Sequence, residues 1–349
     1  MDLNFGVVGY GAWGAHHADT ISRTPGARLV SIATPSADSQ ERAKKAFPAA
    51  EIFSNYHEMF RRKDLDAAVI VLPTYLHEEV STAAFKAGKH VLLEKPMAID
   101  AQGCDRILAA AKKSGKVLNV AHEFRFSIQW GAIKKYVQEG RLGNPIYLLI
   151  NLWRRPYRHG KDGWRRDLSK VGSWIMEEPI HFFDLALWYL QNLGDPVSIF
   201  AQANSRGLAE GFYDNFSAML RWSNGSYAVI SQTLGGFEHH KLIELVGTKG
   251  AVRTWWSGSM DRAEEASFGL KMIEGLKGGE AFDECVATEI PLEGKSGEIY
   301  ELRELMRNVI SSIHAGKPLV SGEEAKKAVM ICRLAEEAVR LRKEISISF

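Results

Sequence analysis

The chain has 349 residues, of which 46% are hydrophobic and 25% charged, so it holds enough apolar material for more than one packed core. Lysine and arginine number 44 against 42 acidic residues, and this formal charge of +2 lacks the basic excess of nucleic-acid binders. We therefore expect two domains and no nucleic-acid partner.

Cysteines and apolar stretches narrow the class further. Cys104, Cys285 and Cys332 are scattered without a C-x-x-C pair, which predicts reduced thiols and no structural zinc site. Glycines interrupt the apolar stretch near the N-terminus where a signal peptide would need it unbroken, and no later stretch approaches the roughly 20 apolar residues that span a bilayer. These features predict a cytoplasmic protein with no membrane partner.

Short apolar strands alternate with amphipathic helices through residues 1–122, which is typical of a parallel sheet covered by helices. This pattern predicts a doubly wound α/β domain. The strands are expected at 3–8, 28–33, 67–72, 90–93 and 117–121, and the clearest helices at 76–87 and 100–114.

Longer alternating strands follow residue 145, and Asn224-Gly225 and Thr248-Lys249-Gly250 are hairpin signals between them. Residues 123–349 are therefore predicted to form an α+β domain with a largely antiparallel sheet. The strands are expected at 146–152, 197–204, 216–222, 227–232 and 241–246, and the helices that cover one face at 179–193, 300–314 and 323–343.

A glycine motif, Gly9-Tyr10-Gly11-Ala12-Trp13-Gly14, directly follows the first predicted strand and opens a helix. This is the context of a dinucleotide-binding fingerprint, although a plain strand–helix turn is the alternative. Gly9 would form the tight turn, Gly11 would let the backbone approach the pyrophosphate, and Gly14 would allow close helix–strand packing. Because the N–H groups at the helix start then face phosphates, the motif predicts an NAD(P) site.

The end of the second predicted strand bears on the choice of cofactor. A NAD-selective site usually places Asp or Glu there against the ribose 2′-hydroxyl, whereas this chain has Thr34 and Ser36, with Arg42 nearby. An acidic side chain would repel the 2′-phosphate of NADP, so its absence slightly favours NADP or use of both cofactors. Asp38 does not alter this prediction, because residues 38–41 have the pattern of a capping box.

Glu94-Lys95-Pro96 follows the strand at 90–93, at the edge of the sheet where doubly wound folds keep their ligands. Lys95 is suited to donate a hydrogen bond to the reacting oxygen, stabilising the charge that develops during hydride transfer. A solvated step from strand to loop is the alternative.

A second cluster of chemical groups surrounds His181. If a helical turn is already formed at Glu177, the side chains of Glu177 and His181 share a face. His181 would then take the hydroxyl proton as base, with Glu177 or Asp184 fixing its orientation. The alternatives are a half-buried histidine among acids that meet the helix dipole, and a metal site, which the single histidine disfavours.

The stretch from Trp153 to Arg166 is dense in aromatic and cationic side chains. Indole rings stack on the C–H surfaces of sugars, and guanidinium groups bind hydroxyls, carboxylates or phosphates. We expect one or two of these side chains to bind an acidic or heavily hydroxylated substrate, a solvated loop being the alternative. The candidates are Arg154, Arg158, Trp164 and Arg165.

Taken together, these motifs resemble the Gfo/Idh/MocA family, of the glucose-fructose oxidoreductase and inositol dehydrogenase type, over essentially the whole chain. The likeness is carried by Gly9–Gly14, Leu72–His77, Ala87–Val91, Glu94–Pro96 and His181-x-x-Asp184. It implies a Rossmann domain followed by an open-faced, largely antiparallel sheet whose outer face builds homodimers or homotetramers in the family.

The resemblance also implies site residues. Lys95 matches the family's catalytic lysine, and Glu177 with His181 matches its Asp-x-x-x-His pair, with Glu in place of Asp and Pro179 in place of the usual glycine. These two departures put transfer of a relative's substrate in doubt. The remaining implied contacts are Pro73, Thr74, His77 and Glu94 with the cofactor, and His122, Arg125 and Asp184 near the substrate. An interface role for the segment 122–126 is the alternative, and the Lys95–Pro96 peptide is expected to be cis.

The sequence thus predicts a metal-free NAD(P)-dependent dehydrogenase or reductase that moves a hydride to or from a hydroxyl carbon of a sugar, polyol or sugar derivative. Two alternatives stay open, a glycoside hydrolase that recycles its NAD internally and a non-catalytic sensor of cofactor and sugar. Retention of Lys95 and His181 argues against the sensor. Either residue can be the final proton acceptor.

Overall fold

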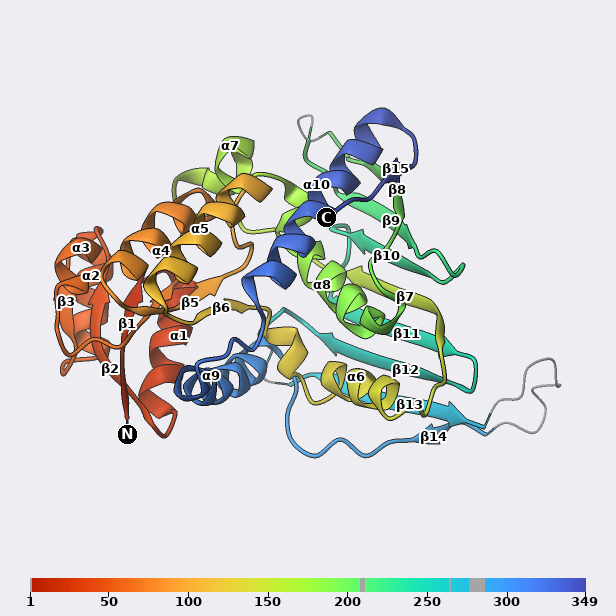
Figure 1. Cartoon of the computed structure of the whole chain (residues 1–349), viewed down its shortest axis with the longest axis horizontal. Helices are drawn as coiled ribbons and strands as arrows, with labels where there is room; N and C mark the ends of the chain where they lie inside the picture. The colour runs from red at the N-terminus through yellow and green to blue at the C-terminus, as the bar shows by residue number, and fades with distance from the viewer. Residues whose placement is uncertain (1, 208–210, 264, 276–285) are drawn as a thin grey trace. The chain divides into compact units, whose positions relative to one another are not determined.

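The computed structural model describes residues 2–207, 211–263, 265–275 and 286–349, which group into two compact units (Figure 1). The first unit consists of Met1–His122, Ser169–Gly172 and Leu302–Val329, and the second of Glu123–Leu168, Ser173–Glu301 and Met330–Phe349. No helix in the described part of the chain is long and apolar enough to cross a membrane. Cys104 and Cys332 are buried free thiols, and Cys285 lies outside the described residues.

A six-stranded parallel sheet forms the first unit, with the strand order β3-β2-β1-β4-β5-β6. Parallel neighbours need crossover connections, which the helices between the strands supply, and the order reverses at β1 as in doubly wound folds. The strands are β1 (Leu3–Val8), β2 (Ala27–Ala33), β3 (Glu51–Phe53), β4 (Ala67–Ile70), β5 (His90–Glu94) and β6 (Leu118–Ala121). The helices are α1 (Ala12–Arg23), α2 (Ala37–Ala46), α3 (Tyr56–Phe60), α4 (His77–Lys86) and α5 (Ala101–Ser114), with a 3-10 turn at Thr74–Leu76. Most of α7 (Leu168–Val171) and α9 (Glu298–Ala315) and the first part of α10 (Gly322–Leu341) also belong to this unit.

The predicted α/β fold is confirmed, with two corrections of detail. Strand β3 was not predicted, because three residues are too few to show a period. The capping box expected at 38–41 is wrong, since α2 begins at Ala37 with Ser36 at its N-cap. The first unit also contains Leu302–Val329: the Asn119 side chain donates to Ser312 Oγ at 3.0 Å and accepts from the Leu319 N–H at 2.7 Å.

A nine-stranded mixed sheet forms the second unit, in the order β14-β13-β12-β11-β7-β10-β9-β8-β15. Among the strand pairs of this sheet that lie in the described residues, only β7 and β10 are parallel, so the sheet is mostly antiparallel. The strands are β7 (Pro145–Trp153), β8 (Ser198–Asn204), β9 (Asn215–Arg221), β10 (Tyr227–Thr233), β11 (His239–Gly247), β12 (Gly250–Gly258), β13 (Ser267–Glu274), β14 (Thr288–Glu289) and β15 (Ile345–Ser346). The helices of this unit are α6 (Trp130–Gln138), α8 (Pro179–Tyr189) and the part of α10 from Met330 on. Its 3-10 turns lie at Glu123–Phe126, Lys161–Arg166, Trp174–Met176 and Gln191–Leu193.

This sheet has one buried and one open face. Along β9 and β10 buried side chains alternate with exposed or half-buried ones, as a sheet covered on one side requires. Large apolar side chains lie on the open face, and Phe200 of β8 is paired in register with Met219 of β9. Both predicted hairpin turns are present, joining β9 to β10 and β11 to β12.

Candidate functional site

The glycine motif joins β1 to α1 through contacts that leave no room for side chains at two positions. Gly9 has a φ of +95°, and a Cβ atom there would lie 2.1 Å from the carbonyl oxygen of Val71. A Cβ on Gly14 would lie 1.9 Å from the carbonyl oxygen of Gly9. Both distances are below any real contact, so these two glycines let the turn and helix α1 pack closely against the sheet.

Gly11 differs, because a Cβ atom there would meet nothing within 4 Å. Gly11 is the N-cap of α1, no side chain caps the helix, and its first turn holds no acidic residue. A helix start with this composition attracts anions through its N–H groups and its dipole. The open space at Gly11 therefore fits the pyrophosphate of a dinucleotide.

The polar groups at and after the end of β2 form hydrogen bonds with other groups of the protein. Thr34 is buried; its N–H donates to the Phe53 carbonyl at 2.9 Å and its carbonyl accepts from Gln40 Nε2 at 2.9 Å. The guanidinium of Arg42 donates to Asp38 at 3.0 Å and to Ser39 Oγ at 2.9 Å, and it lies 5.8 Å from the centre of the Tyr10 ring.

Glu94, at the end of β5, is buried beneath α1. Its Oε1 atom accepts hydrogen bonds from Trp13 Nε1 at 2.8 Å and from His17 Nε2 at 2.6 Å. Burial raises the pKa of Glu94, but these two bonds and the charge of Lys95 outweigh it, so the pKa lies below its ordinary value. No feature of the sequence around His17 predicts that it binds Glu94.

His77 connects the two loops that follow β4 and β5. Its Nδ1 atom lies 2.7 Å from the Pro96 carbonyl and its Nε2 atom 2.8 Å from the Leu72 carbonyl. Burial lowers the pKa of His77, while the two carbonyls favour the charged ring. The Lys95–Pro96 peptide is cis, as predicted. Through its contact with the Pro96 carbonyl, His77 holds the backbone next to Lys95.

His181, in the first turn of α8, is buried in the second unit. Its imidazole stacks on the Phe124 ring, with centroids 4.3 Å apart and planes inclined by 20°. Its Nε2 atom lies 3.7 Å from Glu123 Oε1. Glu123 was not among the predicted site residues, although Arg125 two positions further on was.

Glu177 lies before the helix rather than within it. Since α8 begins at Pro179, the helical spacing assumed between Glu177 and His181 is not present. Glu177 accepts a hydrogen bond from Arg165 Nε, and the Arg165 guanidinium also lies 4.9 Å from the centre of the Trp164 ring. The structure thus brings three of the predicted site residues together in one cluster.

Arg125 and Asp184 form a buried ion pair with two hydrogen bonds. Arg125 Nε donates to Asp184 Oδ2 at 2.8 Å, and Nη2 donates to Oδ1 at 2.6 Å. Such a bidentate pair fixes the position of both side chains, so it holds the turn that carries Arg125 against helix α8, which carries Asp184. His122, also named by the resemblance, is buried at the end of the first unit's main segment.

A larger set of buried charges lies in the second unit, and we call it the buried charge cluster. Arg154 is paired with Glu178, and Arg154 Nη2 lies 3.8 Å from Asp261. Lys241 Nζ lies 3.9 Å from Glu178 and 3.4 Å from Glu298. The predicted substrate residue Arg154 is therefore charge-compensated inside the protein.

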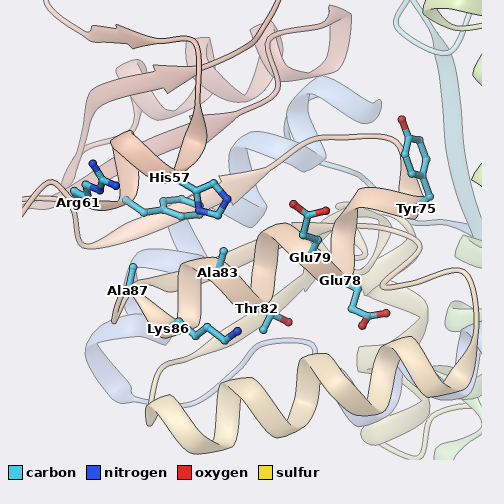
Figure 2. Close-up of a pocket in the computed structure, with 10 residues that line it drawn as sticks. His57, Arg61, Tyr75, Glu78, Glu79, Thr82, Ala83, Lys86 and Ala87 are labelled. Atoms are coloured by element: carbon cyan, nitrogen blue, oxygen red, sulfur yellow. The ribbon is translucent and has the colours of Figure 1, made fainter.

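A surface groove of about 850 Å³ lies between α3 and α4 (Figure 2). It holds none of the predicted site residues, and its acids have partners: Glu78 binds Arg106 and Glu79 accepts from the Tyr56 hydroxyl. The groove therefore adds nothing to the candidate site. Its lining consists of His57, Phe60, Arg61, Tyr75, Glu78, Glu79, Thr82, Ala83, Lys86 and Ala87.

Family models match most of the chain. Residues 3–122 match the oxidoreductase family with the NAD-binding Rossmann fold, and residues 130–253 match the GFO/IDH/MocA C-terminal domain. The inositol 2-dehydrogenase of Rhizobium meliloti is 30% identical over 72% of this chain and 75% of its own. The chain belongs to the Gfo/Idh/MocA family. The myo-inositol 2-dehydrogenase of Thermotoga maritima is 25% identical, over 99% of this chain and 98% of its own length.

Solved structures agree with the Gfo/Idh/MocA fold. A levoglucosan dehydrogenase in complex with NADH and levoglucosan superposes with a TM-score of 0.86 and 19% identity, covering 100% of both chains. At that identity the likeness concerns the fold alone. The chain is thus an NAD-binding oxidoreductase of this family, and its relatives include proteins named as inositol 2-dehydrogenases and a 1,5-anhydro-D-fructose reductase.

Proposed function

We propose that the chain is an NAD(P)-dependent dehydrogenase or reductase acting on a hydroxyl carbon of a cyclic polyol, sugar or sugar derivative. Residues 1–122 form its cofactor domain and residues 123–349 its substrate domain. The observation that carries the proposal is the open space at Gly11, at a helix start with no capping side chain, in the unit that also carries Lys95.

The cofactor would be held by residues of the first unit. Bound there, the nicotinamide supplies the hydride acceptor or donor. Backbone N–H groups at the start of α1 bind the pyrophosphate, and Glu94, itself fixed by Trp13 and His17, keeps the loop of Lys95 in place. The predicted contacts around the cofactor are Gly9, Tyr10, Gly11, Ala12, Trp13, Gly14, Thr34, Ser36, Pro73, Thr74, His77, Glu94 and Lys95.

Lys95 and His181 have the main chemical roles in this proposal. Lys95 donates a hydrogen bond to the reacting oxygen, which stabilises the negative charge that grows on it. His181 takes the hydroxyl proton during oxidation and returns it during reduction. Glu123, whose Oε1 atom lies 3.7 Å from His181 Nε2, orients the imidazole in this proposal, while Glu177 acts on the substrate side through Arg165.

The relatives and the stretch from Trp153 to Arg166, which is dense in aromatic and cationic side chains, support the proposed substrate class. The inositol 2-dehydrogenases that this chain resembles are named for a cyclic polyol. We infer that Trp164 and Arg165 contact such a ring, the indole by stacking and the guanidinium by hydrogen bonds. Arg125, Asp184 and Arg154, which are paired with other side chains, act by shaping the site.

The preference between NAD and NADP rests on few groups. The absence of an acid at Thr34 and Ser36 leans slightly toward NADP, but the Arg42 guanidinium is bound to Asp38 and Ser39. The levoglucosan dehydrogenase of similar fold was solved with NADH. We propose that the chain accepts both cofactors.

We also propose that the open face of the sheet in the second unit builds a homodimer or homotetramer. Phe200, Met219 and Tyr227 lie on three neighbouring strands and are 44%, 39% and 37% exposed. An exposed apolar patch of this kind marks an interaction surface. Light scattering of the wild type and of a Phe200→Glu, Met219→Lys double variant tests this, and a wild type that runs as a monomer would contradict it.

The proposed reaction is tested by mixing the protein with NAD or NADP and a panel of myo-inositol, levoglucosan, D-glucose and gluconate. Absorbance of the reduced nicotinamide should rise with at least one compound and should not rise in the Lys95→Ala and His181→Ala variants. Release of a sugar from a glycoside without net cofactor reduction would favour the hydrolase. Thermal shifts with NADH and NADPH check cofactor binding independently, because a ligand stabilises the folded state that binds it.

A further inference from the structure

Lys241 on β11 carries a buried charge that the proposed reaction does not use. Its side chain is 6% exposed, and its ammonium lies between the carboxylates of Glu298 and Glu178. Burial lowers the pKa of Lys241, but these carboxylates raise it more, so the pKa lies above its ordinary value and the side chain stays charged. Since a buried ion pair is often no more stabilising than apolar side chains of the same size, the charge calls for another explanation.

The Lys241 ammonium contacts two aromatic rings. It lies 4.2 Å from the centre of the Phe124 ring and 5.5 Å from that of Trp256, both within the range of cation–π attraction. Phe124 is the ring on which the His181 imidazole stacks. One aromatic ring therefore touches both the buried ammonium and the proposed base.

A second connection runs through the backbone. Glu178, which pairs with Lys241 and Arg154, is the N-cap residue of α8. Its carbonyl oxygen accepts the backbone N–H of His181 at 3.1 Å. Lys241 thus reaches His181 by two routes, one through a ring and one through the first turn of the helix.

We propose that Lys241 is a positioning residue for His181, holding the plane of its imidazole through Phe124 and the start of α8 through Glu178. The consequence for turnover rests on the proposed role of His181 as base, whereas the geometric claim stands apart from it. A small displacement of a catalytic group can cost a large factor in rate, so removal of the Lys241 cation should act mainly on kcat.

The variants must remove the cation without stranding a buried carboxylate. Lys241→Met with Glu298→Gln removes the cation together with the titratable carboxyl group beside it and keeps the shape of both side chains. Lys241→Arg restores a cation and should rescue the wild-type behaviour at least in part. Lys271→Met with Glu289→Gln is the matched control, because that lysine–glutamate pair lies on the same sheet, 3.0 Å apart, and is exposed to solvent.

The geometric claim is measured by NMR on the full-length protein labelled with ¹³C-histidine. The Hε1–Cε1 signal of His181, assigned by its loss in His181→Asn, is expected upfield because the imidazole faces an aromatic ring. It should move downfield in Lys241→Met/Glu298→Gln and stay in place in the control. With the best substrate of the panel, kcat should fall about tenfold while the Kd for NADH is unchanged.

An unmoved His181 signal in the folded double variant overturns the proposal, and so does a moved signal with unchanged kcat. A wild type that turns over no compound overturns the proposed function, while the NMR result still decides the positioning. If the double variant does not fold, Lys241→Gln with Glu298→Gln takes its place, since two neutral polar side chains can pair with each other while the Phe124 ring is kept. That variant must move the same signal, or the inference is wrong.

Discussion

Replacement of Gly11 by alanine should separate cofactor binding from folding. The backbone at Gly11 has φ −83° and ψ −165°, which alanine adopts freely, and its Cβ would meet no atom within 4 Å. Alanine is a poorer N-cap than glycine by up to about 1 kcal/mol. It also restricts the unfolded chain, which stabilises the fold by about 0.4–1 kcal/mol. These terms nearly cancel, so Gly11→Ala should unfold within about 1 kcal/mol of the wild type.

Dinucleotide binding should respond differently, because the added methyl group occupies the space that fits the pyrophosphate. We expect NADH to bind at least about tenfold more weakly, a loss of about 1.4 kcal/mol. Gly14→Ala is the matched comparison: its Cβ would lie 1.9 Å from the Gly9 carbonyl oxygen, so it should destabilise the fold by about 1–3 kcal/mol. Calorimetric titration with NADH and urea unfolding without cofactor measure the two effects. A folded Gly11→Ala protein with wild-type affinity for NADH and NADPH would refute the reasoning.

Three further predictions concern buried charges, each measured by urea unfolding. His17→Ala removes a hydrogen-bond partner of buried Glu94 and should lower the free energy of unfolding by about 3 kcal/mol at neutral pH. Because the pKa of Glu94 is lowered in the folded state, this difference between variant and wild type should shrink as the pH falls below about 4.5. Asp184→Ala removes the carboxylate that accepts two hydrogen bonds from Arg125 and should cost about 3–5 kcal/mol, whereas replacing both residues by leucine should cost less than that single change. Burial raises the pKa of the Glu298 carboxyl group in the folded state to about 7, whereas its ordinary value is 4.5. Between these two values the folded state binds more protons than the unfolded state, so the free energy of unfolding of the wild type should fall as the pH rises from about 5 to about 8. Glu298→Gln should remove that fall.

The glycine motif and the neighbouring strands could be predicted from the sequence because they follow local rules of backbone conformation and side-chain pattern. The close contact of Gly14 with Gly9 is local, and strand β1 shows an apolar run, so both can be recognised without knowing the fold. The partner of His17 could not be recognised, because Glu94 lies 77 positions away and meets it only when β5 joins the sheet next to β4, which itself pairs with β1. The same holds for Glu123 and His181, which come from separate elements. The sequence places the Glu94 carboxylate at the end of a strand, but it does not indicate that His17 binds it.

Strands β12 and β13 were missed for a different reason. β12 begins and ends with glycine and carries Arg253 and two tryptophans, and β13 contains Gly269, so neither shows a clear apolar–polar alternation. Their place in the sheet is fixed by cross-strand pairing: Trp255 is opposite Gly269, and a Cβ on that glycine would lie 2.5 Å from the indole. Packing of a large ring over a glycine is a property of the pair, which a single strand's sequence does not reveal.

The charges around the predicted substrate loop narrow the substrate class. The sequence suggested that its arginines would favour an acidic or a heavily hydroxylated ligand. In the structure Arg165 is bound by Glu177, and Arg154 by Glu178. A substrate carboxylate would have to compete with those acids and would meet their negative charge, whereas a hydroxyl group can accept from the guanidinium and donate to the carboxylate at once. Under the proposed function, the pairing of both arginines with acids makes a neutral polyol or sugar the expected substrate, and within the panel we expect a lower KM for myo-inositol than for gluconate.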